Sequence, residues 1–134
     1  MSSAVLADIV VQPEGVVITD DGRVETPLTD EFGSGWRGVN LYMDEYSANC
    51  VACHTNPELE VTGLGGDVGP EVRPLGEIYD RAELRAILVN APAIFGEETA
   101  MPAFYVDPGD GLGTLLTAQQ IEDIVSYLME IRSY

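Results

Sequence analysis

The sequence predicts an all-α domain of three or more helices, preceded by an irregular or extended N-terminal arm. Three segments carry apolar residues at helical spacing behind a residue that can cap a helix, and the segments between them contain glycine and proline. The length of 134 residues suits one domain. We therefore expect an arm over residues 1–33 and a single domain over residues 34–134.

The arm combines short apolar runs with turn signals. Ile9-Val10-Val11 and Val16-Val17-Ile18 are β-prone and are separated by Pro13-Glu14-Gly15, and Asp20-Asp21-Gly22 is a typical turn sequence. One interpretation is a short hairpin or an extended arm that lies on the domain. A disordered tail is the alternative.

The first predicted helix begins after Ser34, which can cap it, and runs to about Ala48. Gly38 weakens this helix by up to about 1 kcal/mol relative to alanine. A glycine at this position is explained if another helix crosses closely. The apolar positions follow the i, i+3, i+4, i+7 pattern and are Val39, Tyr42, Met43 and Tyr46.

Two further helices have capping boxes. Asp80 and Glu83 form the box of the second helix, which Pro92 should end because the residue before a proline is disfavoured in helical conformation. Thr117 and Gln120 form the box of the last helix. The apolar stripes are Leu84, Ile87, Leu88 and Ala91 in the former and Ile121, Ile124, Val125, Leu128 and Met129 in the latter.

Two long segments between the helices are predicted to be irregular. Residues 55–79 contain several glycines and prolines, and residues 92–116 carry Met101 followed by Pro102. Long loops inside a compact domain are usually functional or disordered. A loop that wraps a cofactor would account for their length.

The motif Cys50-Val51-Ala52-Cys53-His54 predicts one covalently attached haem c. Each cysteine sulfur would add to one vinyl group on the same edge of the macrocycle, and the two intervening residues let both sulfurs reach. The histidine that follows then points its ring at the iron. Cys50, Cys53 and His54 are therefore predicted to bind haem, with His54 as an axial iron ligand.

Other uses of these three residues fit less well. A structural zinc site needs four Cys or His ligands, and the whole chain offers three. A thioredoxin-like cysteine pair would lie at a helix start within a βαβ pattern, whereas this motif is predicted to follow a helix. A chance occurrence of the motif is the remaining alternative.

The second axial ligand is predicted to be Met101. His54 is the only histidine, so two histidines of this chain cannot bind the iron. Met101 lies in an irregular segment that could reach the distal face of the haem, whereas Met43 is close to the attachment site and Met129 is on the apolar face of the last helix. The alternative is that Met101 only fills space in the core, a common role for methionine.

The segment Gly69-Pro70 is expected to support His54. A histidine that binds a metal normally donates its other ring N–H to a nearby acceptor. A backbone carbonyl in the loop around Pro70 is the best candidate for that acceptor. A simple turn without function is the competing interpretation.

The charge of the chain restricts its partners. The formal net charge is −17, with no lysine among the residues. Such a surface excludes generic nucleic-acid binding and disfavours docking on anionic lipid. It favours a basic protein partner, or else it reflects solubility or a salty habitat. No stretch approaches the roughly 20 apolar residues needed to span a bilayer.

The N-terminus does not have the features of a signal peptide, because it lacks a basic region and a long apolar run. In bacteria, haem is normally attached covalently outside the cytoplasm. We therefore expect a periplasmic protein whose leader peptide is absent from this chain.

These features together resemble the class I cytochromes c. Gly38 and Tyr42 resemble the glycine–aromatic motif of the first helix in that family, which meets the C-terminal helix near Tyr127. The attachment motif, Gly69-Pro70 and Met101-Pro102 follow in the order found in the family. The resemblance implies a fold of three or more helices around one haem.

Within this class, the chain resembles the SoxX family, the small monohaem subunits of periplasmic SoxAX complexes. The resemblance covers most of the chain, and the N-terminal and methionine-containing stretches discriminate better than the attachment motif. The similar stretches are EGVVITDDGRVETPLTD (14–30), ANCVACHTNP (48–57), GDVGPEV (66–72), ETAMPAFYVD (98–107) and LLTAQQIEDIVSYL (115–128).

The resemblance implies an electron-transfer role beside a SoxA-like subunit. SoxAX couples thiosulfate oxidatively to a cysteine of the SoxYZ carrier, an L-cysteine S-thiosulfotransferase activity, and the SoxX haem passes electrons to a downstream soluble cytochrome. The chain would not be catalytic alone, since both of its cysteines are used to hold haem. A free acidic periplasmic electron carrier and the cytochrome partner of a quinoprotein dehydrogenase remain as alternatives.

Overall fold

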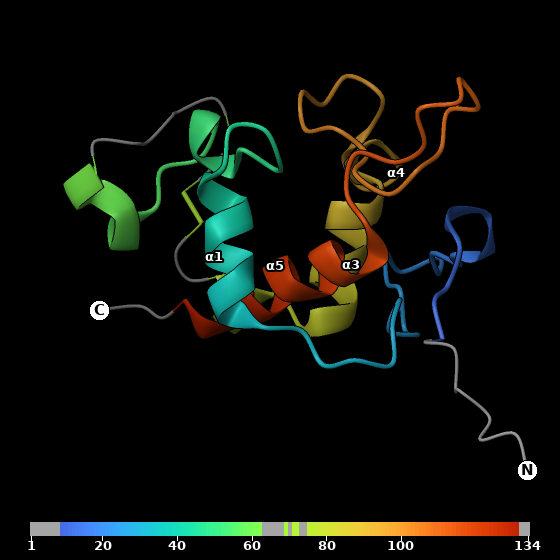
Figure 1. Ribbon diagram of the computed structural model, residues 1–134, viewed down its shortest axis with the longest axis horizontal. Helices are drawn as coiled ribbons and strands as arrows, with labels where there is room; N and C mark the ends of the chain where they lie inside the picture. The colour runs from blue at the N-terminus through green and yellow to red at the C-terminus, as the bar shows by residue number, and fades with distance from the viewer. Residues whose placement is uncertain (1–8, 63–68, 70, 73–74, 132–134) are drawn as a thin grey trace, which may run out of the picture.

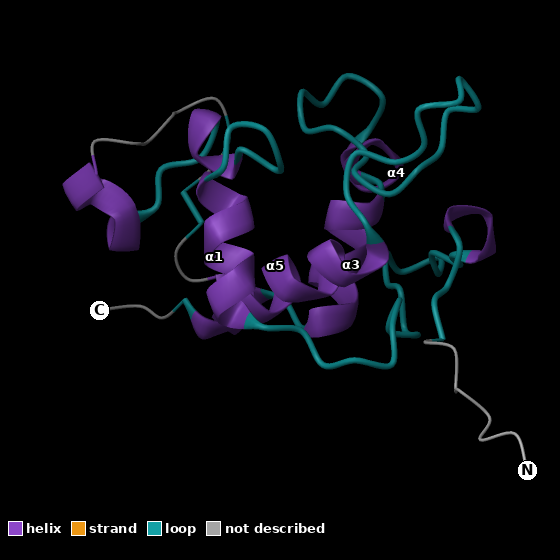
Figure 2. Ribbon diagram, viewed as in Figure 1, coloured by secondary structure: helices purple, strands orange, loops and turns teal. Residues whose placement is uncertain are grey.

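A computed structural model describes residues 9–62, 69, 71–72 and 75–131. Five α-helices occur in these residues, and no strand is formed among them beyond an isolated antiparallel bridge between Val10 and Thr29. The expectation of an all-α fold is therefore confirmed (Figure 2). The helices are α1 (Gly35–Met43), α2 (Leu75–Ile78), α3 (Arg81–Val89), α4 (Ala91–Phe95) and α5 (Ala118–Glu130), and short 3-10 helices cover Pro13–Gly15, Cys50–Ala52 and Pro57–Thr62.

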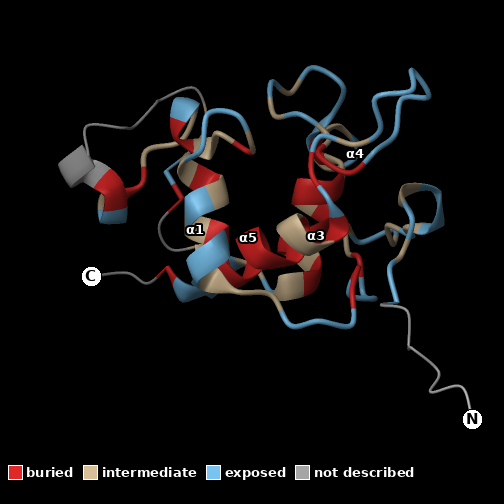
Figure 3. Ribbon diagram, viewed as in Figure 1, coloured by how far each residue is buried: buried red, intermediate tan, exposed pale blue. Residues whose placement is uncertain are grey.

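Helix α5 is the centre of the fold. It packs against α1 on one side and α3 on the other, as Figure 1 shows. The side chains of Ile121, Ile124 and Val125 are completely buried in these contacts. Figure 3 shows the same concentration of buried residues along α3 and α5. The predicted apolar stripe of the last helix thus faces the core.

The crossing of α1 and α5 depends on Gly38. A Cβ atom added to Gly38 would lie 2.1 Å from the carbonyl oxygen of Asp123 and 2.8 Å from the Cβ of Tyr127. Beside this contact, the rings of Tyr42 and Tyr127 pack edge to face with centroids 5.5 Å apart. The glycine in the first helix is therefore explained by a close helix crossing, as expected from the sequence.

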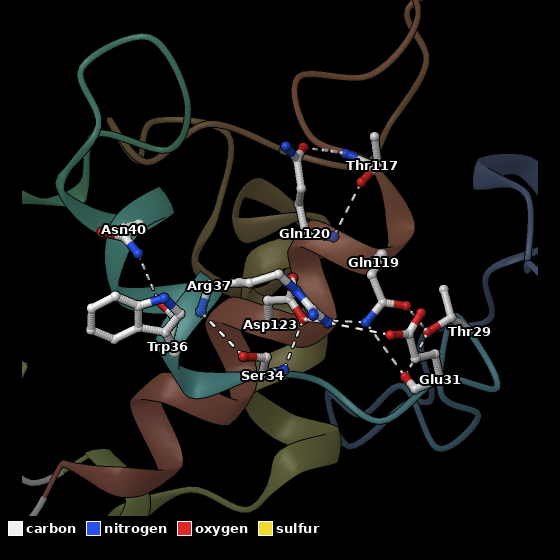
Figure 4. Close-up of polar contacts among 10 residues, drawn as sticks. All are labelled: Thr29, Glu31, Ser34, Trp36, Arg37, Asn40, Thr117, Gln119, Gln120 and Asp123. Carbon is white, nitrogen blue, oxygen red and sulfur yellow. Dashed lines mark hydrogen bonds and ion pairs between the residues drawn. The ribbon is translucent and has the colours of Figure 1, made fainter.

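Polar contacts add to this crossing. Arg37 donates two hydrogen bonds to the carboxylate of Asp123, with Nε–Oδ2 and Nη2–Oδ1 distances of 2.9 and 3.1 Å (Figure 4). Asp123 also accepts a hydrogen bond from the backbone N–H of Ser34 and one from the side chain of Gln119. The start of α1 is thus hydrogen-bonded to the first half of α5.

The predicted helix starts are confirmed. Ser34 accepts a hydrogen bond from the N–H of Arg37 at the start of α1. Asp80 with Glu83 forms a complete capping box on α3, and Thr117 with Gln120 forms another on α5.

The predicted end of the first helix is wrong. Helix α1 ends at Met43, five residues before Ala48. The carboxylate of Asp44 accepts hydrogen bonds from the N–H of Tyr46 and the hydroxyl of Ser47, which favours a turn over further helix. As a result Tyr46 is 90% exposed and does not belong to the apolar stripe.

The segments predicted to be irregular contain helices. Pro92 does not terminate helical structure, because α3 has already ended at Val89 and Pro92 lies in the first turn of α4. A proline is tolerated there, since its missing N–H would have no partner within the helix. Asn90 caps α4 by accepting a hydrogen bond from the N–H of Ala93. In the same way, residues 55–79 contain α2 and a 3-10 helix.

The described part of the arm contributes to the core. The side chains of Val24 and Leu28 are buried. The carbonyl of Val24 accepts a hydrogen bond from Arg85 on α3, and the N–H of Leu28 donates one to Glu122 on α5. Residues 24–28 are thus held by two helices rather than by their own local structure. No helix in the described parts of the chain has the length and apolar character needed to cross a bilayer.

Candidate cofactor site

A pocket of about 390 Å³ lies beside the attachment motif. This volume is within the usual range for small-molecule sites of about 300–1,000 Å³. Its walls are mainly apolar, including side chains of α3 and of the segment after α4. The four predicted haem-binding side chains that lie in described segments all line this pocket: Cys50, Cys53, His54 and Met101.

A single tight turn places the two cysteines and the histidine on the pocket. The carbonyl of Cys50 accepts hydrogen bonds from the N–H groups of Cys53 and His54, at 3.2 and 2.9 Å. Asn49, just before the turn, has a left-handed backbone conformation with φ of 49°. Because this turn brings Cys50 and Cys53 to one wall, a planar group could bond to both sulfurs.

The state of the thiols argues against a redox pair. Burial raises the pKa of the Cys50 thiol to about 12. Reactive cysteines of thioredoxin-like proteins have the opposite shift, because a lowered pKa supplies the nucleophilic thiolate. Cys50 therefore lacks the lowered pKa that is typical of the reactive cysteine in a thioredoxin-like pair.

The imidazole of His54 lies against the backbone of Gly69. A Cβ atom at position 69 would be 2.3 Å from Cε1 of the ring and 2.6 Å from Nδ1, so any side chain would displace the histidine. The N–H of Gly69 also donates a 2.6 Å hydrogen bond to the carbonyl of Cys53. The sequence predicted that the Gly69-Pro70 segment supports His54 through a backbone carbonyl. The structure places Gly69 against the ring, and Pro70 lies outside the described residues.

Of the methionines in the described residues, Met101 lines the pocket, together with its neighbours Ala100 and Pro102. Met43 and Met129 are partly buried and pack against the hydrophobic core. Their placement agrees with the sequence argument that separated Met101 from the other internal methionines.

Tyr42 provides an independent indication of a bound group. It lines the pocket and is only 1% exposed, and its hydroxyl makes no hydrogen bond of normal geometry within the described structure, although the Asn56 side chain lies near it. Buried hydroxyls are rarely left without a partner. An apolar cavity with two thiols, an imidazole, a thioether and an unpartnered hydroxyl at its walls fits haem c.

Tyr127 is a further supporting residue. Its hydroxyl accepts a 2.9 Å hydrogen bond from the side-chain amide of Asn56, which is buried two residues after His54. The same hydroxyl donates to the carboxylate of Glu58. Helix α5 therefore holds the segment that follows the motif. In the sequence, the only sign of this hydrogen bond to Tyr127 is that Asn56 lies two residues after the motif.

The comparison with sequence families decides the classification. The family profile described as Cytochrome c matches residues 37–132. The chain belongs to the cytochrome c family. Membership in the cytochrome c family implies a covalently bound haem c and a role in electron transfer.

Among solved structures, this cytochrome c is similar to a chain in the crystal structure of SoxXA from P. pantotrophus. The sequence identity is 38%, the TM-score is 0.80, and the match covers 89% of this chain and 96% of the other. The resemblance to SoxX expected from the sequence is confirmed. A search of curated proteins finds no match.

Proposed function

We propose that this cytochrome c is the electron-transfer subunit of a periplasmic SoxAX-type complex and carries one haem. Cys50 and Cys53 form the thioether bonds, and His54 and Met101 are the axial ligands, within a cytochrome c domain over residues 34–134 that follows an arm over residues 1–33. The observation that carries the proposal is that these four side chains line one apolar pocket.

The ligand set favours electron transfer over binding of small molecules. A haem supplies a one-electron couple, and a methionine ligand raises its potential relative to stronger donors. If His54 and Met101 both bound the iron, they would leave no position open to oxygen or peroxide. The apolar walls, including Leu88 and Phe104, exclude water and stabilise the less charged form of the centre.

The partner is proposed from the solved relative. The similar chain belongs to a SoxXA assembly, and the match extends over nearly the whole of both chains. We therefore expect a SoxA-like cytochrome subunit, with SoxYZ as the carrier on which thiosulfate is coupled to a cysteine. That coupling forms a sulfur–sulfur bond and releases two electrons, which this haem would pass one at a time to a downstream soluble cytochrome.

Haem attachment can be tested on the matured protein. A pyridine haemochrome spectrum and an intact mass should give one haem per chain, and Cys50→Ser combined with Cys53→Ser should leave no haem after acid–acetone extraction. Met101→Ala should keep the haem attached but change the ferric spectrum and lower the potential, whereas the control Met129→Ala should leave both unchanged. Covalent haem in the double cysteine variant would overturn the attachment.

The partner can be tested separately. Co-expression with a SoxA-like subunit should yield a stable heterodimer that reduces this haem when thiosulfate and SoxYZ are added. A monomer that exchanges electrons with a quinoprotein dehydrogenase, or one that associates with neither, would contradict the SoxAX assignment and favour the partner-cytochrome or free-carrier alternative.

A further inference from the structure

The N-terminal arm contacts the segment that carries Met101. The hydroxyl of Tyr105 donates a 2.7 Å hydrogen bond to the backbone carbonyl of Val11. Tyr105 follows Met101 by four residues and is 4% exposed. Because a buried hydroxyl needs a partner, this bond couples the position of the segment after α4 to the presence of the arm.

The hydrogen bond at Val11 is the first of a series that ends in the core. The N–H of Val11 donates to the carbonyl of Leu28 at 2.8 Å, and the N–H of Leu28 donates to Oε2 of Glu122 at 3.2 Å. Glu122 is held in turn by its buried ion pair with Arg85. Tyr105 is thus connected through two extended segments of the arm to the ion pair between α3 and α5.

Successive side chains of this segment contact the pocket and the arm. Phe104 lines the pocket, whereas the hydroxyl of the next residue, Tyr105, bonds to the arm. The N–H groups of Phe104 and Tyr105 donate to the carbonyls of Leu88 and Val89 at the end of α3. A shift of the tyrosine would therefore move the pocket wall as well.

On its C-terminal side, the segment is held by the N–H of Leu116, which donates a 3.0 Å hydrogen bond to the carbonyl of Phe104. Residues 106–113 are exposed, and three glycines there, at positions 109, 111 and 113, have positive φ angles. On the N-terminal side, Pro102 restricts the backbone directly after Met101. The N–H of Met101 donates a 3.4 Å hydrogen bond to the hydroxyl of Thr99, and Phe104 and Tyr105 make the next hydrogen bonds along the segment, to α3 and to the arm.

We propose that Tyr105 is a positioning residue for Met101: its hydrogen bond to Val11 makes the N-terminal arm part of the structure that holds the axial methionine at the haem. The inference rests on the proposed function, since it takes Met101 as the axial ligand. The arm then has a role in the redox centre as well as in the core.

Imidazole binding to the ferric haem tests this role in the full-length holoprotein. Imidazole can bind the iron only when the methionine has left, so its apparent affinity rises with the population of the displaced state. Tyr105→Phe should increase that affinity about tenfold, the scale of one lost buried hydrogen bond. The matched control Tyr46→Phe removes an exposed hydroxyl and should leave the affinity unchanged.

A truncation tests the same hydrogen bond by removing its acceptor, the carbonyl of Val11. Removing residues 1–12 deletes Val11 and should raise imidazole affinity as Tyr105→Phe does, and the two changes combined should add little. Circular dichroism at each imidazole concentration checks that the chain remains folded. If Tyr105→Phe binds imidazole as weakly as the unaltered protein, the positioning role is overturned.

Met101→Ala separates this inference from the proposed function. It should bind imidazole most tightly of all the variants. If its affinity and ferric spectrum equal those of the unaltered protein, Met101 is not the ligand, and the proposed axial ligation fails together with the inference. If Met101→Ala behaves as expected and Tyr105→Phe does not, only the inference fails.

Discussion

Arg85 and Glu122 form a two-point ion pair in the interior of the protein. The Nε–Oε2 and Nη2–Oε1 distances are 2.7 and 2.9 Å, and both side chains are 4% exposed. The third nitrogen of the guanidinium donates to the carbonyl of Val24, and the carboxylate also accepts from the N–H of Leu28. The pair therefore joins α3, α5 and the arm with its main hydrogen-bonding groups satisfied.

Breaking this pair should destabilise the protein strongly. Glu122→Gln leaves the Arg85 charge buried without a counter-charge, which typically costs about 3–5 kcal/mol. Urea unfolding followed by circular dichroism would measure the loss. Replacing both residues, with Arg85→Met and Glu122→Leu, should recover a large part of it, since a buried ion pair adds little net stability over apolar packing.

The exposed pair between Arg37 and Glu31 provides the control. Glu31→Gln should change the free energy of unfolding by less than about 1 kcal/mol, because exposed ion pairs are weak. Equal effects of Glu122→Gln and Glu31→Gln would show that the buried pair contributes no more to stability than an exposed one.

Gly69→Ala should disturb the iron ligand rather than the fold. The new methyl group would overlap the His54 ring, which must rotate or move away. We expect lower yields of attached haem and a changed ferric spectrum, measured by pyridine haemochrome and absorption. Gly15→Ala is a matched control, because a Cβ there meets only Val11 at 3.7 Å. A normal spectrum in Gly69→Ala would show that His54 does not need this contact.

Gly38→Ala should destabilise the crossing of α1 and α5. In an isolated helix alanine is favoured over glycine by about 1 kcal/mol, but here its methyl group meets the backbone of Asp123. Overpacking of this kind typically costs about 1–3 kcal/mol, so the net effect on the urea midpoint should be a decrease. Asn40→Ala, an exposed substitution in the same helix, should have little effect. An increased midpoint for Gly38→Ala would contradict the close crossing.

The sequence predicted those features that depend on neighbouring residues. The caps at Ser34, Asp80 and Thr117 are recognisable because each bond spans only three residues. The cysteines and histidine of the attachment motif could be identified for the same reason. Met101 was chosen because the chain has a single histidine and Met101 lies in an irregular segment, and its place on the same pocket is a finding of the structure.

Apart from the close helix crossing at Gly38, the features that depend on distant residues were not predicted. Arg85 and Glu122 are 37 positions apart and look like ordinary surface charges in an acidic chain. The Gly69-Pro70 segment was expected near His54, but the close packing of Gly69 against the ring was not predicted, because it depends on how the loop folds back. Locally, the turn at Asp44 was missed because its side-chain hydrogen bonds compete with a helix that the apolar spacing alone would continue to Ala48.

The start of α3 predicts a dependence of stability on pH. The N–H of Glu83 and the guanidinium of Arg23 both hydrogen-bond the carboxylate of Asp80, and they hold its pKa below the usual value. A carboxyl whose pKa is lower in the folded state stabilises the protein above its unfolded pKa of about 3.9. This stabilisation is lost as the pH falls through the folded pKa.

Asp80→Asn keeps an acceptor for the cap but removes the charge. The variant should therefore be less stable than the unaltered protein at neutral pH, and the difference in urea midpoint should shrink progressively below about pH 4. A difference that stays constant from neutral pH to about pH 3 would mean that the charge of Asp80 contributes nothing and that the cap alone stabilises α3.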